Sequence, residues 1–208
     1  MSSQVSSGHE EPGRELNLGE ATPPRQAATV ILMRGGEDAL EVLLVKRTEK
    51  ARFMGGVWVF PGGAVDDDDS AHRAAAVREL AEEAGIALED PGALVEFSRW
   101  ITPAEVAVRF DTRFFLAELP DDQEPVIDGE ECVEAGWFTP RGALEAFEQG
   151  EIVLVFPTIK HLERLDAFSS VAELLDYASG REVLPVQPKV VLEGEVARVL
   201  LPGEPGYE

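Results

Sequence analysis

One arginine and three glutamates, Arg78, Glu79, Glu82 and Glu83, lie close together near the middle of the chain. At about 100° per residue, a helix turns these glutamates away from an apolar face formed by Val77, Leu80, Ala81 and Ala84. Residues 71–86 contain two arginines and no lysine, so pairing with positive charges one turn away does not account for the cluster. A hard divalent cation, Mg²⁺ or Mn²⁺, would relieve the repulsion between the carboxylates. The alternative is an exposed acidic helix without a ligand.

Arg78 precedes Glu82 by one helical turn. Its planar guanidinium can hold one oxygen of that carboxylate and leave the other for a metal ion or water. Gly85 follows the cluster and is expected to end the helix as its C-cap. These residues predict an acidic metal-binding helix with a fixed orientation of Glu82.

The helix and the turn before it resemble the Nudix box. That pattern is Gly, five residues, Glu, seven residues, Arg-Glu, an aliphatic residue, any residue, Glu-Glu, any residue, Gly and an aliphatic residue. Gly63 matches its start, and residues 78–86 match its second half at every specified position. The middle departs, because Asp69 or Ser70 stands where the pattern has glutamate, depending on the direction of counting. We interpret this as a one-residue insertion with Asp69 as a shorter substitute, which affects rate and metal geometry more than reaction class.

A basic segment precedes the box. Lys46, Arg47, Lys50 and Arg52 fall within seven positions of an otherwise acidic chain, which suits a ligand rich in phosphate. The spacing of Arg47, Arg52 and Gly56 before residues 60–63 resembles the extra motif of the coenzyme A pyrophosphatases. This resemblance implies that Arg47, Arg52, Gly62 and Gly63 bind the substrate. The alternative is a solvated loop that balances nearby acidic residues.

Two later segments, residues 99–103 and 109–117, resemble the branch of the Nudix superfamily that includes the peroxisomal acyl-CoA pyrophosphatases. Their aromatic residues are expected in the core rather than as platforms for a ligand: Trp100, Phe110, Phe114 and Phe115. Cys132 is expected to be buried packing, and His161 a surface or packing residue.

A further glutamate is expected from the acidic loop at residues 120–134, since Nudix enzymes often take a metal ligand or general base from a loop there. Glu131, six residues before Trp137, is the favoured residue, with Glu130 and Glu124 as substitutes. Any of the three is also compatible with an ordinary solvated side chain.

The Nudix resemblance implies hydrolysis of a diphosphate linkage with Mg²⁺ or Mn²⁺ held by Glu79, Glu82 and Glu83. The cation would neutralise phosphate charge and orient a water molecule, with Arg78, Glu82 and Glu131 as catalytic residues. Three hypotheses stay open. The first is a coenzyme A or acyl-CoA pyrophosphatase that yields 3′,5′-ADP and a 4′-phosphopantetheine. The second is a pyrophosphatase for ADP-ribose, dinucleotides or nucleoside triphosphates, and the third is a regulatory binding module with little or no turnover, which the Asp69-Ser70 departure favours.

The composition of the chain disfavours some classes of binding partner. The net charge of −22, from 40 acidic and 18 basic residues, disfavours nucleic acid and anionic membranes. A single cysteine excludes an internal disulfide and fits a reducing compartment. Without a long apolar run or a signal segment, we expect a soluble cytoplasmic protein. The Nudix resemblance also allows a homodimer.

The elements that position these residues follow from the pattern along the chain. Strands are expected at residues 27–33, 41–46, 93–101, 109–119, 135–139 and 189–201. Helices are expected at 140–150, with Thr139 as N-cap, and at 157–179, with a break near Ser169. The resulting fold class is α/β, a Nudix-type α/β/α sandwich with a mixed sheet and a C-terminal helical extension. The expected domains are a disordered tail at 1–25, the Nudix hydrolase domain at 26–156 and an extension at 157–208 packed on it.

Overall fold

The computed structural model describes residues 20–36, 39–51, 54–193 and 196–207 of the 208-residue chain. In chain order the elements are β1 (Arg25–Arg34), β2 (Glu41–Arg47), β3 (Trp58–Val59), β4 (Gly62–Ala64), α1 (His72–Ala84), the 3₁₀ turn η1 (Pro91–Ala93), β5 (Val95–Ile101), β6 (Phe110–Glu118), β7 (Cys132–Phe138), α2 (Pro140–Glu148), α3 (Phe156–Leu165), α4 (Val171–Ala178), β8 (Pro185–Val186), β9 (Lys189–Glu193) and β10 (Val196–Leu200). Of the disordered tail predicted at residues 1–25, residues 1–19 lie outside the described residues. No helix among the described residues is long and apolar enough to cross a bilayer.

Eight of the described strands form one mixed sheet in the order β3-β2-β1-β6-β5-β8, with β7 paired to β2 and β4 paired to β1. At its centre β1 and β6 run parallel, from Arg25 opposite Phe110 to Met33 opposite Glu118. On its other side β1 pairs antiparallel with β4 along its first half and with β2 at its end. This change of partner carries β4, with its two glycines, next to α1.

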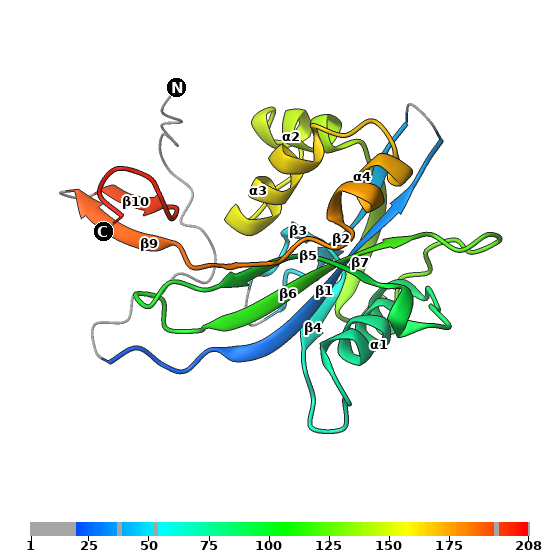
Figure 1. The fold of residues 1–208 in the computed structure, drawn as a ribbon, viewed down its shortest axis with the longest axis horizontal. Helices are drawn as coiled ribbons and strands as arrows, with labels where there is room; N and C mark the ends of the chain where they lie inside the picture. The colour runs from blue at the N-terminus through cyan, green and yellow to red at the C-terminus, as the bar shows by residue number, and fades with distance from the viewer. Residues whose placement is uncertain (1–19, 37–38, 52–53, 194–195, 208) are drawn as a thin grey trace.

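Alternate residues of β1 enter two separate hydrophobic cores. Val30 and Leu32 pack with α1 on one face of the sheet, while Ile31 and Met33 pack with α2, α3 and α4 on the other. Figure 1 shows the helices divided in this way, α1 on one side and the remaining three opposite. Because both faces are covered, β1 is continuously apolar from Val30 to Met33. The predicted α/β/α sandwich with a mixed sheet is confirmed.

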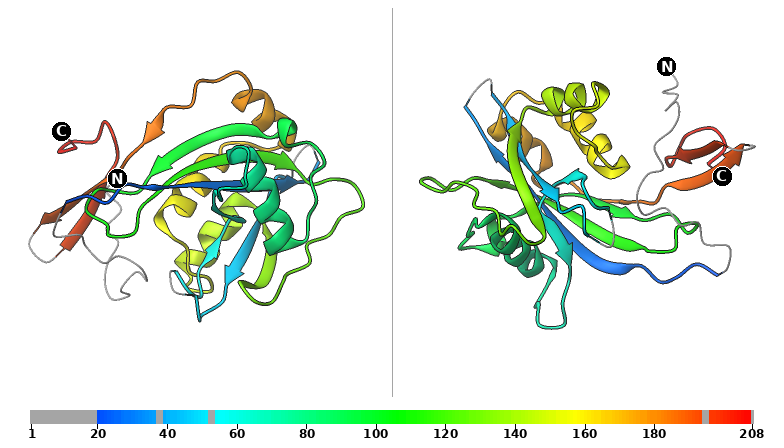
Figure 2. Two further views of the ribbon diagram at one scale, coloured as in Figure 1. Left: turned by 90° about the horizontal axis from the view of Figure 1, so that it is seen from below. Right: turned by 180° about the vertical axis from the view of Figure 1, so that it is seen from behind.

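The C-terminal part agrees with the prediction in one detail and differs from it in another. The expected break near Ser169 is confirmed and separates α3 from α4, with the Ser170 hydroxyl accepting from the Glu173 N–H as an N-cap. The single strand expected at 189–201 is wrong, because the chain reverses and forms the antiparallel pair β9 and β10. Figures 1 and 2 show this hairpin projecting beyond the end of the main sheet.

Candidate active site

Helix α1 ends where its sequence predicts. Gly85 is the C-cap, with a φ of 66°, and its N–H donates to the Ala81 carbonyl. A left-handed backbone of this kind favours glycine, because a side chain there is strained. The helix therefore stops one residue after Ala84, and the whole carboxylate cluster lies in its last two turns.

Arg78 connects the helix to the loop before it. One guanidinium nitrogen, Nη1, donates to Glu79 Oε1 at 2.8 Å and to Glu82 Oε2 at 2.9 Å. The other, Nη2, donates to the Ala64 carbonyl at 3.0 Å and to Asp69 Oδ2 at 2.9 Å. The predicted contact between Arg78 and Glu82 is confirmed. These hydrogen bonds raise the pKa of Arg78, so its charge is permanent.

Asp69 takes two of the hydrogen bonds from this guanidinium. Besides the contact to Oδ2, the Arg78 Nε–H donates to Asp69 Oδ1 at 3.3 Å. The hydrogen bond from Arg78 lowers the pKa of the Asp69 carboxyl against the opposing effect of burial. Asp69 also accepts from the Asp66 N–H at 2.9 Å, which closes the acidic loop. The shorter carboxylate thus reaches the arginine from its loop position.

The helix pattern predicts that the three glutamates share one exposed face, and this prediction is wrong. The side chain of Glu82 is 60% exposed, whereas those of Glu79 and Glu83 are 13% and 3% exposed. Ala81, expected on the apolar face, is exposed instead. The reason is that Glu83 Oε2 accepts from the Gly62 N–H of β4 at 2.9 Å, which turns this carboxylate inward. Glu79 and Glu83, one turn apart, line the side of α1 that faces β4.

Glu83, which is buried, and Glu79, which is partly buried, carry unfavourable negative charge. Burial raises the pKa of Glu83 to about 7, with the charges of Glu79 and Glu131 adding to the effect. Burial also raises the pKa of Glu79, partly offset by Arg78. Arg47 partly compensates the negative charge of Glu83, because its Nη1 lies 3.8 Å from Glu83 Oε1. This imbalance is one that a bound cation would relieve.

The donor set fits a divalent cation. Nudix hydrolases generally need one, and Mg²⁺ binds through one or two carboxylates while it keeps several waters. Glu79 and Glu83 would supply two such carboxylates. Among the described residues, no three Asp, Glu, His or Cys side chains already converge as a metal site. Arg78 holds both Glu79 and Glu82, and Glu82 is mostly exposed, so the predicted set of Glu79, Glu82 and Glu83 stays a prediction.

Glu131 lies close to this pair. It is exposed on the loop before β7, and its charge raises the pKa of both Glu79 and Glu83. Its carbonyl accepts from the Thr48 N–H at 2.9 Å, which ties the loop to the end of β2. Of its two substitutes, Glu130 is also exposed on this loop, while Glu124 lines a separate hollow beside Arg34.

Sequence reasoning missed the residue that fixes this loop. The Asp128 carboxylate accepts from the N–H groups of Glu131 at 2.9 Å and Cys132 at 3.0 Å. The signal was present, because an Asp-Gly dipeptide commonly makes such a turn. Cys132 is fully buried as predicted, and burial raises the pKa of its thiol to about 12, so it is no nucleophile at neutral pH.

The structure describes only part of the basic segment, which includes Arg47. Arg47 ends β2 beside Glu83, and its Nε is buried without a hydrogen-bond partner in the described part of the chain. Arg52, the second predicted phosphate ligand, lies outside the described residues. The site therefore brings Arg47, Glu79, Glu83 and Glu131 together, with Arg78 behind them.

Two glycines of β4 let the backbone approach α1. A Cβ on Gly62, where φ is 156°, would meet the Ala28 carbonyl oxygen at 2.4 Å. A Cβ on Gly63 would meet Glu79 Oε1 at 2.4 Å. Both glycines thus shape the position of the glutamates, while direct substrate contact by either stays a prediction.

Comparison with known proteins gives consistent matches. The NUDIX domain family model matches residues 23–155. A Caenorhabditis elegans protein named "Putative nudix hydrolase 7" is 28% identical over 88% of this chain and 74% of its own length. The human acyl-coenzyme A diphosphatase NUDT19 is 33% identical over 57% of this chain, which spans only 33% of that protein. The crystal structure of a NUDIX hydrolase from Alicyclobacillus acidocaldarius superposes with a TM-score of 0.67, at 31% identity over 74% of this chain and 96% of that one.

Proposed function

The chain belongs to the Nudix family and is a hydrolase, and from this premise we propose that it cleaves the diphosphate linkage of coenzyme A or an acyl-CoA. Two observations support this substrate class over other Nudix substrates. The basic segment that contains Arg47 and Arg52 resembles the motif of coenzyme A pyrophosphatases. One relative, which matches 57% of this chain, is named an acyl-coenzyme A diphosphatase.

The position of Arg47 carries the proposal. This guanidinium lies 3.8 Å from the buried Glu83 carboxylate and has a buried Nε–H with no acceptor among the described residues. A phosphate oxygen is a fitting acceptor, because the arginine fork matches phosphate geometry. Substrate phosphate bound here would lie next to the carboxylates of α1, where hydrolysis is expected.

The proposed reaction adds one water molecule across a P–O–P bridge. The water oxygen forms the new bond to one phosphorus, the bridging oxygen leaves with the other, and the products are 3′,5′-ADP and (acyl-)4′-phosphopantetheine. A divalent cation at Glu79 and Glu83 would supply charge neutralisation and water activation. Glu131 takes the proton from the attacking water, Arg47 offsets phosphate charge, and Arg78 keeps Glu79 and Glu82 in position.

The first experiment compares coenzyme A, 3′-dephospho-coenzyme A and ADP-ribose as substrates with Mg²⁺ or Mn²⁺. Coenzyme A is expected to be hydrolysed with the highest kcat/KM, by at least tenfold, and addition of EDTA is expected to abolish turnover. Mass spectrometry in ¹⁸O-labelled water identifies the attacked phosphorus. Equal turnover of all three substrates would remove the coenzyme A assignment and leave a general Nudix pyrophosphatase.

Variants then test the roles of the residues. Glu83→Gln and Glu82→Gln are expected to lower kcat, and Glu83→Gln more strongly because its carboxylate is buried beside Glu79. Glu148→Gln, an exposed glutamate at the end of α2, is the matched control and is expected to leave activity unchanged. Arg47→Ala is expected to raise KM for coenzyme A. An unchanged KM in Arg47→Ala would show that this arginine does not bind the substrate.

A further inference from the structure

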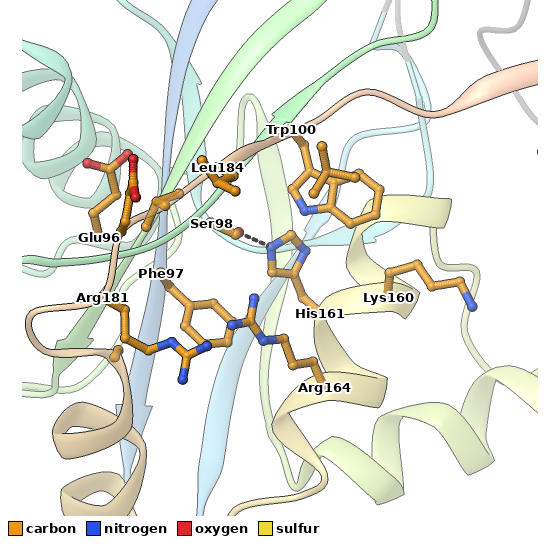
Figure 3. A pocket seen from close by; sticks show the side chains of 13 residues that line it. Glu96, Phe97, Ser98, Trp100, Lys160, His161, Arg164, Arg181 and Leu184 are labelled. Atoms are coloured by element: carbon orange, nitrogen blue, oxygen red, sulfur yellow. Dashed lines mark hydrogen bonds between the residues drawn. The ribbon is translucent and has the colours of Figure 1, made fainter. Parts of the chain in front are cut away.

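A cavity lies on the face of the sheet opposite α1. It has a volume of about 160 Å³ and is bounded by β5, α3, α4 and the segment that leads into β8 (Figure 3). Phe97, Ser98 and Trp100 line it from β5, and His161 and Arg164 from α3. The hydrophobic core that contains Phe97 belongs to the side of α2, α3 and α4, whereas α1 packs in the other core. The sheet therefore separates this cavity from Glu79 and Glu83.

Ser98 and His161 form a buried polar pair in its lining. They are 5% and 2% exposed, and Ser98 Oγ lies 2.5 Å from His161 Nε2. The other ring nitrogen, Nδ1, lies 2.6 Å from the Pro157 carbonyl oxygen. Because a carbonyl only accepts, Nδ1 carries the proton, and the Ser98 hydroxyl donates to Nε2. The Ser98 oxygen keeps lone pairs that can accept from a donor on a ligand.

Two arginines stand at this cavity without an acidic partner. Among the described residues, neither Arg164 nor Arg181 has a carboxylate within ion-pair distance, in a chain with 40 acidic and 18 basic residues. Arg164 stacks over Phe97 at 4.2 Å, measured from its guanidinium carbon to the ring centroid. Both arginines also face the Tyr177 ring, at 5.7 Å for Arg164 and 4.3 Å for Arg181. Both arginines are exposed, so water screens the repulsion between them, and an anion bound between them would interact with both.

The other charges of the lining are mostly paired. Lys160 Nζ lies 2.7 Å from the Glu163 carboxylate, and Glu96 accepts from Arg113 at 2.9 Å. Glu182 is exposed on the lining and opposes the arginines. The two arginines and Glu182 together leave one positive charge, which fits an anionic ligand.

We propose that this cavity binds a small organic anion that carries one carboxylate or phosphate group. Arg164 and Arg181 bind the anionic group, and Phe97 and Trp100 contact a ring or short chain. The volume is similar to that of a cavity of about 150 Å³ that accommodates benzene in another protein. A hydroxyl or amino group on the ligand would donate to Ser98. The site is independent of the diphosphate substrate on the other face.

Isothermal titration of the full chain in EDTA tests this site with benzoate, phenyl phosphate and inorganic phosphate as probes. Benzoate or phenyl phosphate is expected to bind saturably at one site, at least fivefold more tightly than inorganic phosphate. Comparison of the two ring compounds identifies carboxylate or phosphate as the preferred group. Arg164→Gln and Arg181→Gln are each expected to weaken binding at least fivefold, and Glu182→Gln to strengthen it about twofold by removing the opposing charge.

Matched controls locate the bound probe. Arg141→Gln removes an exposed arginine of α2 that pairs with Asp166, and it is expected to leave binding unchanged. Glu83→Gln on the opposite face is likewise expected to have no effect. The proposal is overturned if neither ring compound saturates, if the Arg164 and Arg181 variants bind like the wild type, or if only Glu83→Gln alters binding.

Discussion

At the scale of single residues, three carboxylates and a carbonyl accept hydrogen bonds from the guanidinium of Arg78. Each of these partners helps to set where the others lie. Asp69 comes from the loop, whereas Glu79 and Glu82 come from the helix itself. A change at Asp69 therefore acts on the glutamates through the arginine, without direct contact with them.

Replacing Asp69 tests this arrangement. Asp69→Ala is expected to lower kcat/KM by about 10- to 100-fold, the range usual for residues that orient metal-binding side chains. Asp69→Asn keeps an acceptor for Arg78 and is expected to lose less. Steady-state kinetics with coenzyme A measures both. Asp67→Ala, at an exposed position in the same loop, is the control, and equal activity of the Asp67 and Asp69 variants would contradict the positioning role.

His161 predicts a pH dependence of stability. Burial lowers its pKa to about 4, against an ordinary value of 6.5. Above pH 6.5 both the folded and the unfolded histidine are neutral, so the contribution to stability is complete. Between pH 6.5 and 4 the unfolded state takes up a proton that the folded state excludes, so stability falls as the pH falls. The interval corresponds to roughly 3 kcal/mol of unfolding free energy.

Urea denaturation at several pH values measures this effect. Other groups also titrate in this range, so the quantity to compare is the difference between the wild type and His161→Gln. That difference is expected to shrink from pH 7 to pH 4 and then level off. If this difference did not depend on pH, the pKa of His161 in the folded protein would be the same as in the unfolded protein, and the prediction would be wrong.

At the scale of elements, the close approach of β4 to α1 determines the site. Gly63 adopts a backbone that other residues tolerate, but a Cβ there would meet Glu79 Oε1 at 2.4 Å. Gly62 differs, because its Cβ would meet the fixed backbone of Ala28 and Thr29. The first position therefore affects a movable side chain, and the second affects the pairing of β4 with β1.

Alanine at these two positions separates activity from stability. Gly63→Ala is expected to fold and to lose activity about tenfold or more, because Glu79 must move away from Arg78. Gly62→Ala is expected to lower the melting temperature clearly. Gly36→Ala, where a Cβ meets no atom within 4 Å, is the control for both measurements. Full activity of Gly63→Ala would mean that the position of Glu79 is unimportant for the reaction.

The sequence predicted most elements because their patterns are long. The apolar runs of β1, β2, β5 and β6, the C-cap of α1 and the N-cap of α2 are all local signals. The two-residue strand β3 and the glycine-containing β4 were missed. Neither has a periodic pattern, and β4 is a strand only because β1 pairs with it. The C-terminal hairpin was missed because its alternating residues fit one strand as well as two.

The candidate site was predictable in composition but not in orientation. Arg78 and the three glutamates follow from the motif. The inward turn of Glu83 depends on the Gly62 N–H, 21 residues earlier, and the contact with Arg47 joins residues still farther apart. The Ser98–His161 pair has no sequence signal at all, since 63 residues separate its members.

At the scale of the whole molecule, the β9–β10 hairpin stands apart from the main sheet (Figures 1 and 2). An isolated two-stranded hairpin is marginally stable in water. Its Val190 N–H donates to Glu105, in the loop between β5 and β6, at 3.4 Å. Because the hairpin forms a sheet of its own, we expect it to contribute little to the fold that positions α1.

Deletion of residues 189–208 tests this independence. The melting temperature is expected to change by no more than roughly 2–4 °C, which corresponds to about 1 kcal/mol in a chain of this size. The kcat/KM for coenzyme A is expected to stay within about twofold. A large loss of either quantity would show that the hairpin supports the catalytic domain, for example through a contact between subunits.

The parallel pairing of β1 with β6 also has a consequence for how the chain reaches its fold. Arg25 and Phe110, which lie opposite each other, are 85 positions apart. Closing so long a loop costs entropy before the contacts form, and domains dominated by such distant pairings fold in milliseconds to seconds. During synthesis, β1 and α1 leave the ribosome before β6 exists. Their apolar faces, including Val30, Leu32 and Leu80, then lack the strand that completes their core, and this interval is when the nascent chain is most prone to aggregate.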